Sequence, residues 1–113
     1  MTQINMHSFI SKLIEAGNAY DTETYLSLYH DTAILDDPSV GRKFIGHTGI
    51  RDYFESYFIG YNTQTTLKKL ECRGANAHIE VQFNGDFPEG VVTGTFDFKF
   101  ESGKIAAARA DLI

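Results

Sequence analysis

An aspartate followed by proline, Asp37-Pro38, is the residue pair in this sequence that is best suited to chemistry. Apolar Ile34 and Leu35 precede the pair, and a Phe44-x-Gly46 turn follows it. This setting predicts that the Asp37 carboxylate points into the protein, where it would serve as a general base. The other interpretation is that Asp37 caps the turn before Pro38 or is partly solvated.

The remaining titratable residues offer fewer possibilities. Asp36 is one residue earlier on an extended segment and should point to the opposite face, so we do not expect a pair of catalytic carboxylates. His47 precedes the third expected helix and would either line a pocket mouth as a proton shuttle or be an exposed loop residue. The spacing of His, Cys and carboxylate residues indicates no metal site, and we expect no cofactor. Cys72, the single cysteine, is expected to be buried as a small apolar residue.

The composition fits one globular domain spanning residues 1–113. The chain is 42% hydrophobic and 22% charged, with a formal net charge of -5. This charge disfavours nucleic acid or an anionic membrane surface as a partner. The chain contains neither an N-terminal leader pattern nor a run of about 18 apolar residues, so we expect a soluble cytoplasmic protein without a membrane partner.

The first half of the chain is expected to form three helices and a short strand around residues 33–36. Asp21 is suited to cap the second helix and Thr48 the third, and Gly60 would end the third. The aromatic residues of the third helix would be core, pocket walls or both. The three apolar stripes are Ile4, Phe9, Ile10, Leu13, Ile14 and Gly17; Tyr25, Leu26, Leu28 and Tyr29; and Ile50, Tyr53, Phe54, Tyr57 and Phe58.

The second half of the chain changes to the two-residue period of strands. Residues 77–84 alternate apolar with polar side chains, and residues 67–73 and 91–101 supply the neighbouring strands. The last hairpin turns at Glu101-Ser102-Gly103. Phe96, Phe98 and Phe100 share one strand face, which we expect to be core.

The loop length of that last hairpin decides where two charged residues point. A two-residue loop would pair Phe96 with Arg109 and drive Arg109 and Asp111 inward. A three-residue loop with Gly103 left-handed would pair Phe98 with Ala106 and send both charges outward. The cost of burying charge favours the three-residue loop, although a further bulge would reverse this preference.

Three helices followed by a curved, mainly antiparallel sheet give an α+β, cone-shaped fold with a pocket at its open end. Four runs carry a resemblance to a known family: residues 29–38, 44–46, 49–54 and 95–105. Their order and spacing resemble the nuclear transport factor 2-like superfamily, in its SnoaL-like and ketosteroid isomerase-like branch. The resemblance covers nearly the whole chain.

This resemblance implies roles for individual residues. Asp37 matches the aspartate that moves a proton in ketosteroid isomerases, and Tyr29 matches a supporting tyrosine. Leu13 and Phe96 stand where those enzymes have their two oxyanion donors, and Phe54 lacks the hydroxyl of a further tyrosine. Because losing one oxyanion donor costs about 10²–10³ in rate, we do not expect steroid isomerisation by the familiar route.

We therefore expect the pocket to bind a small hydrophobic organic molecule. One hypothesis is an isomerase, cyclase or hydrolase in which Asp37 is the general base and Tyr29 orients it or its water. The alternative is a non-catalytic ligand-binding or dimerisation module of the same fold. The resemblance also implies a homodimer through the outer sheet face, where we expect Thr93, Thr95, Asp97 and Lys99. The expected pocket residues are Leu13, His47, Phe54, Tyr57, Phe58 and Phe96.

Overall fold

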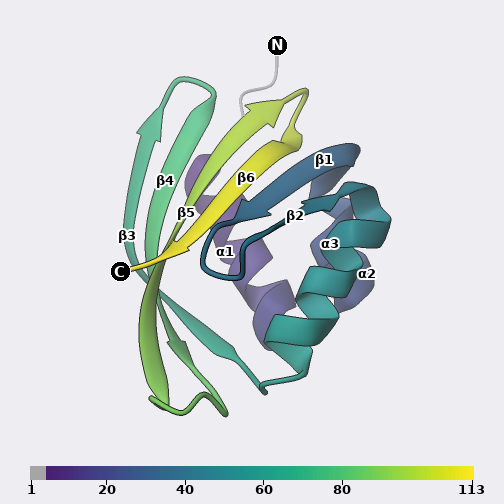
Figure 1. The fold of residues 1–113 in the computed structure, drawn as a ribbon. Coiled ribbons are helices and arrows are strands. Elements are labelled where there is room, and N and C mark those ends of the chain that lie inside the picture. Colours follow the sequence, from purple (N-terminus) through teal and green to yellow (C-terminus); the bar gives the residue numbers. More distant parts are fainter. Residues whose placement is uncertain (1–4) are drawn as a thin grey trace.

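Three helices lie against one face of a curved six-stranded sheet in the computed structural model, which describes residues 5–113 (Figure 1). The helices are α1 (Met6–Asn18), α2 (Thr22–Ser27) and α3 (Gly46–Phe54), and a π-helical segment, η1 (Glu55–Ile59), continues α3. The strands are β1 (Tyr29–Asp37), β2 (Arg42–Ile45), β3 (Gln64–Arg73), β4 (Asn76–Asn84), β5 (Val91–Glu101) and β6 (Lys104–Leu112). The predicted α+β architecture is confirmed; Ile4 of the first predicted stripe lies outside the described residues.

A side chain caps the N-terminus of two of the three helices α1, α2 and α3. The Asn5 side chain accepts a hydrogen bond from the Ser8 backbone N–H at the start of α1. Asp21 caps α2 as predicted, because its side chain accepts from the Thr24 N–H. The prediction that Thr48 caps α3 is wrong: α3 already begins at Gly46, directly after β2, and has no side-chain cap.

The sheet order is β2-β1-β6-β5-β4-β3, and every neighbouring pair is antiparallel except β1 and β6, which run parallel. The chain therefore returns from the far edge to place its last strand beside its first. The short strand β2 was not predicted from the sequence, because its four residues, two charged and then two apolar, lack the two-residue alternation of a strand. β1 extends well beyond the predicted residues 33–36.

The last hairpin contains a two-residue turn, Ser102-Gly103, so the predicted three-residue loop is wrong. Both turn residues have positive φ, 49° and 82°, which is the conformation of the two-residue turns that join twisted strands. The register then shifts between Lys99 and Phe100, so that one extra residue of β6 forms a bulge.

That bulge restores the predicted orientation of the last strand. Arg109 pairs with Asp97 on the outer sheet face, and Asp111 pairs with Thr95 there. On the inner face Phe98 lies opposite Ala108, whereas the three-residue loop predicted Ala106 as its partner. Both charged side chains are therefore exposed, at the cost of one irregularity in the ladder.

The core lies between the helices and the inner face of the sheet and is rich in aromatic side chains, including Tyr25, Tyr29, Phe44 and Phe54. Cys72 is exposed on the edge strand β3, which corrects the prediction that it is buried. Among the described residues, no helix is long and apolar enough to cross a membrane.

Candidate functional site

Asp37 is the only charged side chain buried in the part of the chain that the structure describes, with 6% of its surface exposed. Its Oδ1 accepts hydrogen bonds from the Ser39 backbone N–H at 3.0 Å and from the Ser39 hydroxyl at 2.5 Å. Its Oδ2 accepts one from the Tyr53 hydroxyl at 3.1 Å. An ionised carboxylate offers about four acceptor sites, so Oδ2 has capacity for one further donor.

The local sequence explains this placement of Asp37. β1 ends at Asp37, and Pro38 begins the turn to β2, which the Val40 N–H closes on the Asp37 carbonyl. Proline favours this turn position, and an aspartate at the turn start accepts from the backbone two residues on. The predicted turn-capping role therefore holds through Oδ1, while Oδ2 is turned toward Tyr53 on α3.

Asp37 lines a cavity of about 230 Å³ at the end of the molecule where η1, the β1–β2 turn and the β4–β5 loop meet. Six of its fourteen lining residues are aromatic: Tyr53, Tyr57, Phe58, Tyr61, Phe83 and Phe87. They form one continuous row of contacts from Phe83 to Phe87, with successive ring centroids 5.5–6.4 Å apart. The cavity thus combines an aromatic wall with one buried carboxylate.

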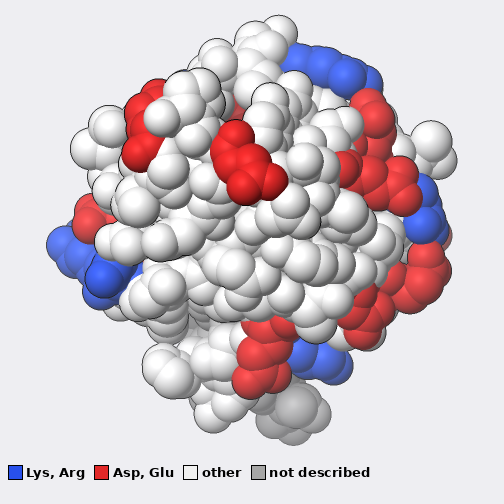
Figure 2. Space-filling view, turned by 90° about the horizontal axis from the view of Figure 1, so that it is seen from below, with Lys and Arg blue, Asp and Glu red and all other residues white. Residues whose placement is uncertain are grey.

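The charge of this site is negative. Asp37 and Glu89 line the cavity, and no Lys, Arg or His of residues 5–113 does. Arg42, the cross-strand neighbour of Asp37, instead forms an ion pair with Asp52 at 3.0 Å. Figure 2 shows this end of the molecule: most of its surface is uncharged, acidic groups lie on it, and Lys and Arg lie toward its edge. Asp37 therefore has hydrogen-bond donors but no cationic partner within the described structure.

Tyr53, which contacts the Asp37 carboxylate, and the hydrogen-bonded pair Tyr25 and Tyr29 are all buried. Burial, and next the negative charge of Asp37, raise the pKa of Tyr53 well above its ordinary value of 10.0. Burial also raises the pKa of Tyr25 to about 12. Burial, and then Tyr25, raise the pKa of Tyr29 as well. All three hydroxyls are therefore neutral hydrogen-bonding groups at physiological pH.

The predicted site residues Tyr29 and His47 do not line the cavity. The Tyr29 hydroxyl is 2.9 Å from the Tyr25 hydroxyl, and no hydrogen bond joins it to Asp37. Tyr53 has the contact with Asp37 that was predicted for Tyr29. His47 is half-buried on α3, with its Nε2 2.8 Å from the Tyr29 carbonyl oxygen, so it is neither an exposed loop residue nor part of the cavity wall.

The predicted apolar pocket residues divide into three groups. Tyr57 and Phe58 line the Asp37 cavity. Leu13 and Phe96, again with Phe58, line a separate inner space of only about 20 Å³. Phe54 is fully buried and stacks on Tyr25, with ring centroids 4.3 Å apart, so it belongs to the core. Of the predicted apolar pocket residues, the Asp37 cavity therefore includes Tyr57 and Phe58.

Sequence reasoning missed the side chains that complete the site. Ser39 follows Asp37 by two residues, which is the spacing of an aspartate-capped turn and could have been read as such. Tyr53 was assigned to an aromatic stripe, but its hydrogen bond depends on how α3 packs on β1, which the stripe does not specify. Phe87 and Glu89 come from the β4–β5 loop, for which the sequence has no periodic signal.

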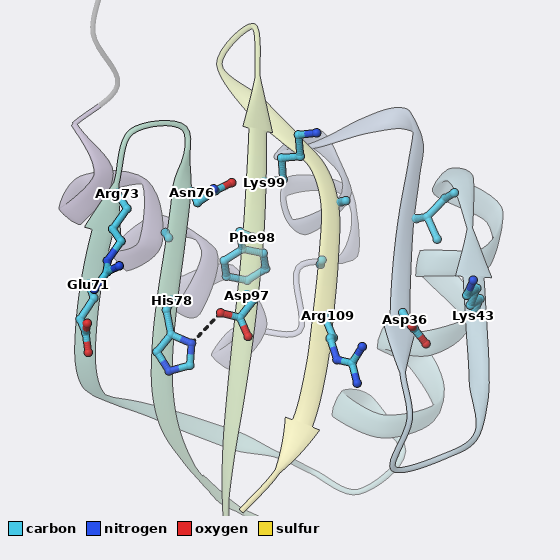
Figure 3. Close-up of a pocket in the computed structure, with 14 residues that line it drawn as sticks. Asp36, Lys43, Glu71, Arg73, Asn76, His78, Asp97, Phe98, Lys99 and Arg109 are labelled. Atoms are coloured by element: carbon cyan, nitrogen blue, oxygen red, sulfur yellow. Dashed lines mark hydrogen bonds and ion pairs between the residues drawn. The ribbon is translucent and has the colours of Figure 1, made fainter.

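A larger and more open hollow, of about 850 Å³, lies on the opposite, outer face of the sheet (Figure 3). Seven of its fourteen lining residues are charged, and the lining comes from all six strands. Unlike this hollow, the Asp37 cavity combines apolar walls with a buried carboxylate, which is the usual composition of a small-molecule site.

The comparisons with known proteins agree with this fold. The family model of the SnoaL-like domain matches residues 10–108. A candidate polyketide cyclase from Sinorhizobium meliloti superposes with a TM-score of 0.83 at 19% identity, over 91% of this chain and 93% of that chain. A candidate ketosteroid isomerase from Kribbella flavida gives a TM-score of 0.82 at 14% identity, over 94% and 76%.

A third solved structure was determined with a bound small molecule. It is a protein with a ketosteroid isomerase-like fold from Catenulispora acidiphila, in complex with trimethylamine, with a TM-score of 0.80 at 14% identity over 90% of this chain and 82% of that chain. No curated protein matches the chain. At these identities the structural likenesses show the fold.

Proposed function

This chain belongs to the SnoaL-like domain family, and from that membership and the Asp37 cavity we propose that it binds a small, mainly hydrophobic organic ammonium ion. The observation that carries the proposal is a buried carboxylate without a cationic partner at the end of an aromatic cavity. A buried charge is costly unless it is paired. A ligand cation on the Asp37 Oδ2 would supply the missing partner.

The cavity wall supports the same ligand class. A cation over the face of a tyrosine or phenylalanine is attracted by the ring, by about 0.5–2 kcal/mol depending on solvent exposure. Six rings line this cavity, and Glu89 adds a second acidic group. The structure of the Catenulispora acidiphila protein with trimethylamine is a related fold holding such an amine.

The volume supports a single-ring ligand. A cavity of about 150 Å³ holds benzene, so about 230 Å³ fits one ring or a branched chain with a short polar arm. The fused rings of a steroid would not fit inside. This size supports the expectation that steroid isomerisation is not the activity.

A matched ligand series tests this proposal. Three phenylalkyl compounds of equal length, ending in an ammonium, an alcohol and a carboxylate, are titrated into the protein and followed by NMR shifts of residues around the cavity. We expect the ammonium to bind at least tenfold more tightly than the alcohol, and the carboxylate to bind most weakly. Asp37→Asn should remove the preference for the ammonium, whereas Asp36→Asn, which changes the same charge on the other sheet face, should retain it. Equal binding of the ammonium and the carboxylate would refute the proposal.

General-base catalysis by Asp37 is the second candidate function, as an isomerase, cyclase or hydrolase. It is favoured by the contact between the Tyr53 hydroxyl and Asp37 Oδ2, because a fixed carboxylate at a cavity wall is suited to take a proton from an uncharged substrate. Tyr57 and Tyr61 would have to stabilise the developing negative charge, since Leu13 and Phe96 carry no donor.

Hydrogen–deuterium exchange at carbon tests for this chemistry. A single-ring ketone that fits the cavity is incubated in D₂O, and exchange next to its carbonyl is measured by NMR with wild-type protein and with Asp37→Asn. Exchange above the buffer rate that is lost in the variant would support a general base. Exchange at the buffer rate, in a protein that still binds the phenylalkyl ammonium, would argue against a general base and support a non-catalytic binding module.

We also propose that two chains associate through the outer face of the sheet. The support is that this face carries no helix, although it spans all six strands (Figure 1). Light scattering at micromolar concentration should give the mass of a dimer, and a monomer would contradict this proposal.

A further inference from the structure

One charged or ionisable residue from each strand lies in a single row across the outer face of the sheet. The cross-strand pairs are continuous from one edge to the other, so the row can be followed through the register. Figure 3 shows these side chains on the open side of the sheet, with the helices behind it. In the order β3-β4-β5-β6-β1-β2, the row is Glu71, His78, Asp97, Arg109, Asp36 and Lys43.

The signs alternate along this charged row: each acidic residue is followed by a basic one, counting protonated His78 as a cation. His78 and Asp97 already pair within the chain, with Nδ1 and Oδ1 2.6 Å apart. Glu71 pairs with Lys69 of its own strand, with Oε1 and Nζ 3.0 Å apart. In the described residues, Arg109, Asp36 and Lys43 take part in no ion pair. Half of the row therefore remains available to an outside partner.

When a second copy of a row of six alternating charges is laid on the first in the reversed direction, every charge lies opposite a charge of the other sign. From this property we propose that the outer sheet face binds a second copy of the chain about a two-fold axis parallel to the strands. The axis runs between β5 and β6, so Asp97 faces the partner's Arg109 and, by symmetry, Arg109 faces the partner's Asp97. Farther out, His78 faces the partner's Asp36, and Glu71 faces the partner's Lys43. The inference rests on the proposed dimer and specifies its arrangement.

The other face-to-face arrangement is disfavoured by the same row. An axis that runs across the strands, along the row, would set each residue against its own copy and so bring like charges together at five positions, and at a sixth when His78 is protonated. Like charges that face each other in an interface are strongly unfavourable. With the axis parallel to the strands, the neighbouring row, which contains Asn76, Lys99 and Ala107, also brings no like charges together: Lys99 faces the partner's Ala107, and Asn76 faces the partner's Ile34.

The size of this face suits a stable dimer. Six strands about 4.8 Å apart span about 24 Å. Strands of nine residues run for about 30 Å, and five of the six strands have at least that length, whereas β2 has four residues. The face therefore measures at most about 700 Å² per chain, slightly below the roughly 800 Å² that each partner buries in a standard interface. Ile34 and Ile45, which pair at one end of the face and are both exposed, would add apolar contact.

A mixing experiment tests the arrangement. Asp97→Lys and Arg109→Glu are prepared separately, and sedimentation gives the dissociation constant of each dimer. Each variant alone sets like charges against each other across the axis, so its dissociation constant should rise at least tenfold. In an equimolar mixture the introduced lysine of one variant meets the introduced glutamate of the other, and native mass spectrometry should show a heterodimer with affinity near that of the wild type.

The edge strands provide a second, independent pair. Lys43→Glu and Glu71→Lys lie at opposite edges of one chain, about five strand spacings or 24 Å apart. Each should weaken the dimer, and the double variant should recover it, because these positions meet only between subunits. Glu15→Lys is the control: it makes the same charge change as Glu71→Lys at an exposed residue of α1, on the other side of the sheet, and should leave the dissociation constant unchanged.

The outcomes separate the arrangement from the association itself. Wild-type protein that stays monomeric would overturn the dimer altogether. A wild-type dimer whose affinity is unchanged in folded Asp97→Lys and Arg109→Glu variants, or is not restored by mixing them, would overturn the arrangement alone. Neither result depends on ligand binding in the Asp37 cavity, which lies on the other side of the sheet.

Discussion

At the scale of single residues, the site depends on how one buried carboxylate is held. Asp37 would be costly to bury alone, but three hydrogen bonds from Ser39 and Tyr53 fix both oxygens and compensate part of that cost. The same bonds determine the direction in which Oδ2 faces the cavity. Tyr53 is therefore both a structural partner of Asp37 and a determinant of how a ligand would meet it.

Removing the Tyr53 hydroxyl should show this double role. Tyr53→Phe leaves the buried Oδ2 without its protein donor, so we expect the free energy of unfolding in urea to fall by about 1–3 kcal/mol. Tyr57→Phe is the matched control, since the structure shows no hydrogen bond from the Tyr57 hydroxyl, and it should change stability by less than about 0.5 kcal/mol. Equal effects of the two substitutions would argue against the Tyr53–Asp37 contact.

The buried tyrosines predict how stability depends on alkaline pH. The folded-state pKa values of Tyr25, Tyr29 and Tyr53 lie above the ordinary 10.0, so the neutral form is favoured in the folded protein. Their contribution is complete below about pH 10 and is lost as the pH rises through the folded values, about 12 for Tyr25. Stability should therefore fall above pH 10, with ionisation of these tyrosines coinciding with unfolding in an absorbance titration at 295 nm. Their ionisation in the still-folded protein at pH 10 would contradict this account.

At the scale of elements, the cavity requires the sheet to curve closely around the aromatic wall. Gly94 in β5 lies where a Cβ atom would come within 2.6 Å of the Phe83 ring and 3.1 Å of the Asp111 carbonyl oxygen. Phe83 lines the Asp37 cavity and has edge-to-face contacts with Phe58 and Phe96. A glycine at this position therefore permits the close approach of ring and strand.

Gly94→Ala should accordingly affect both stability and the cavity. The added methyl group forces Phe83 to move, and we expect a loss of about 1–3 kcal/mol in unfolding free energy. Thr95→Ala, at the next residue on the outer face, is the control and should not weaken ligand binding. Calorimetry and the ammonium titration together measure both effects. A Gly94→Ala protein with wild-type stability and affinity would show that this close packing is unimportant.

The sequence predicted elements better than the contacts between them. The aspartate at Asp37-Pro38 and the helical stripes could be recognised because each depends on local spacing. The bulge in β6 could not, since either hairpin loop satisfies the local pattern and the bulge lets the two-residue turn keep Arg109 exposed. The exposure of Cys72 depends on β3 being an edge strand, and the Tyr53–Asp37 contact depends on helix packing. Both are tertiary properties.

At the scale of the whole molecule, the two sheet faces are proposed to have different tasks. The inner face and its helices enclose the aromatic cavity, whereas the outer face displays the charged row. The net charge of -5 opposes self-association of the chain. The dimer therefore requires specific pairs of opposite charges in addition to non-specific apolar contact. This separation would allow the interface to change without altering the ligand site.

The ion pairs proposed across the dimer interface predict how the dissociation constant of the dimer depends on salt. Ion pairs across the interface are screened as the Debye length falls from about 10 Å at 0.1 M salt to about 3 Å at 1 M. We therefore expect sedimentation to show a weaker dimer at the higher salt concentration. A dimer that strengthens with salt would indicate a mainly apolar interface and would contradict a dominant role for the charged row.

The most direct test of the central claim is a crystal structure of the protein with the phenylalkyl ammonium ligand. We predict that the aromatic ring lies against Tyr57 and Phe58 and that the ammonium nitrogen lies within about 3 Å of Asp37 Oδ2. The Asp37→Asn protein, crystallised in the same way, should not hold the ligand in this pose. A ligand bound in the hollow of the outer face, or in the cavity with its ammonium group directed away from Asp37, would contradict the proposed site.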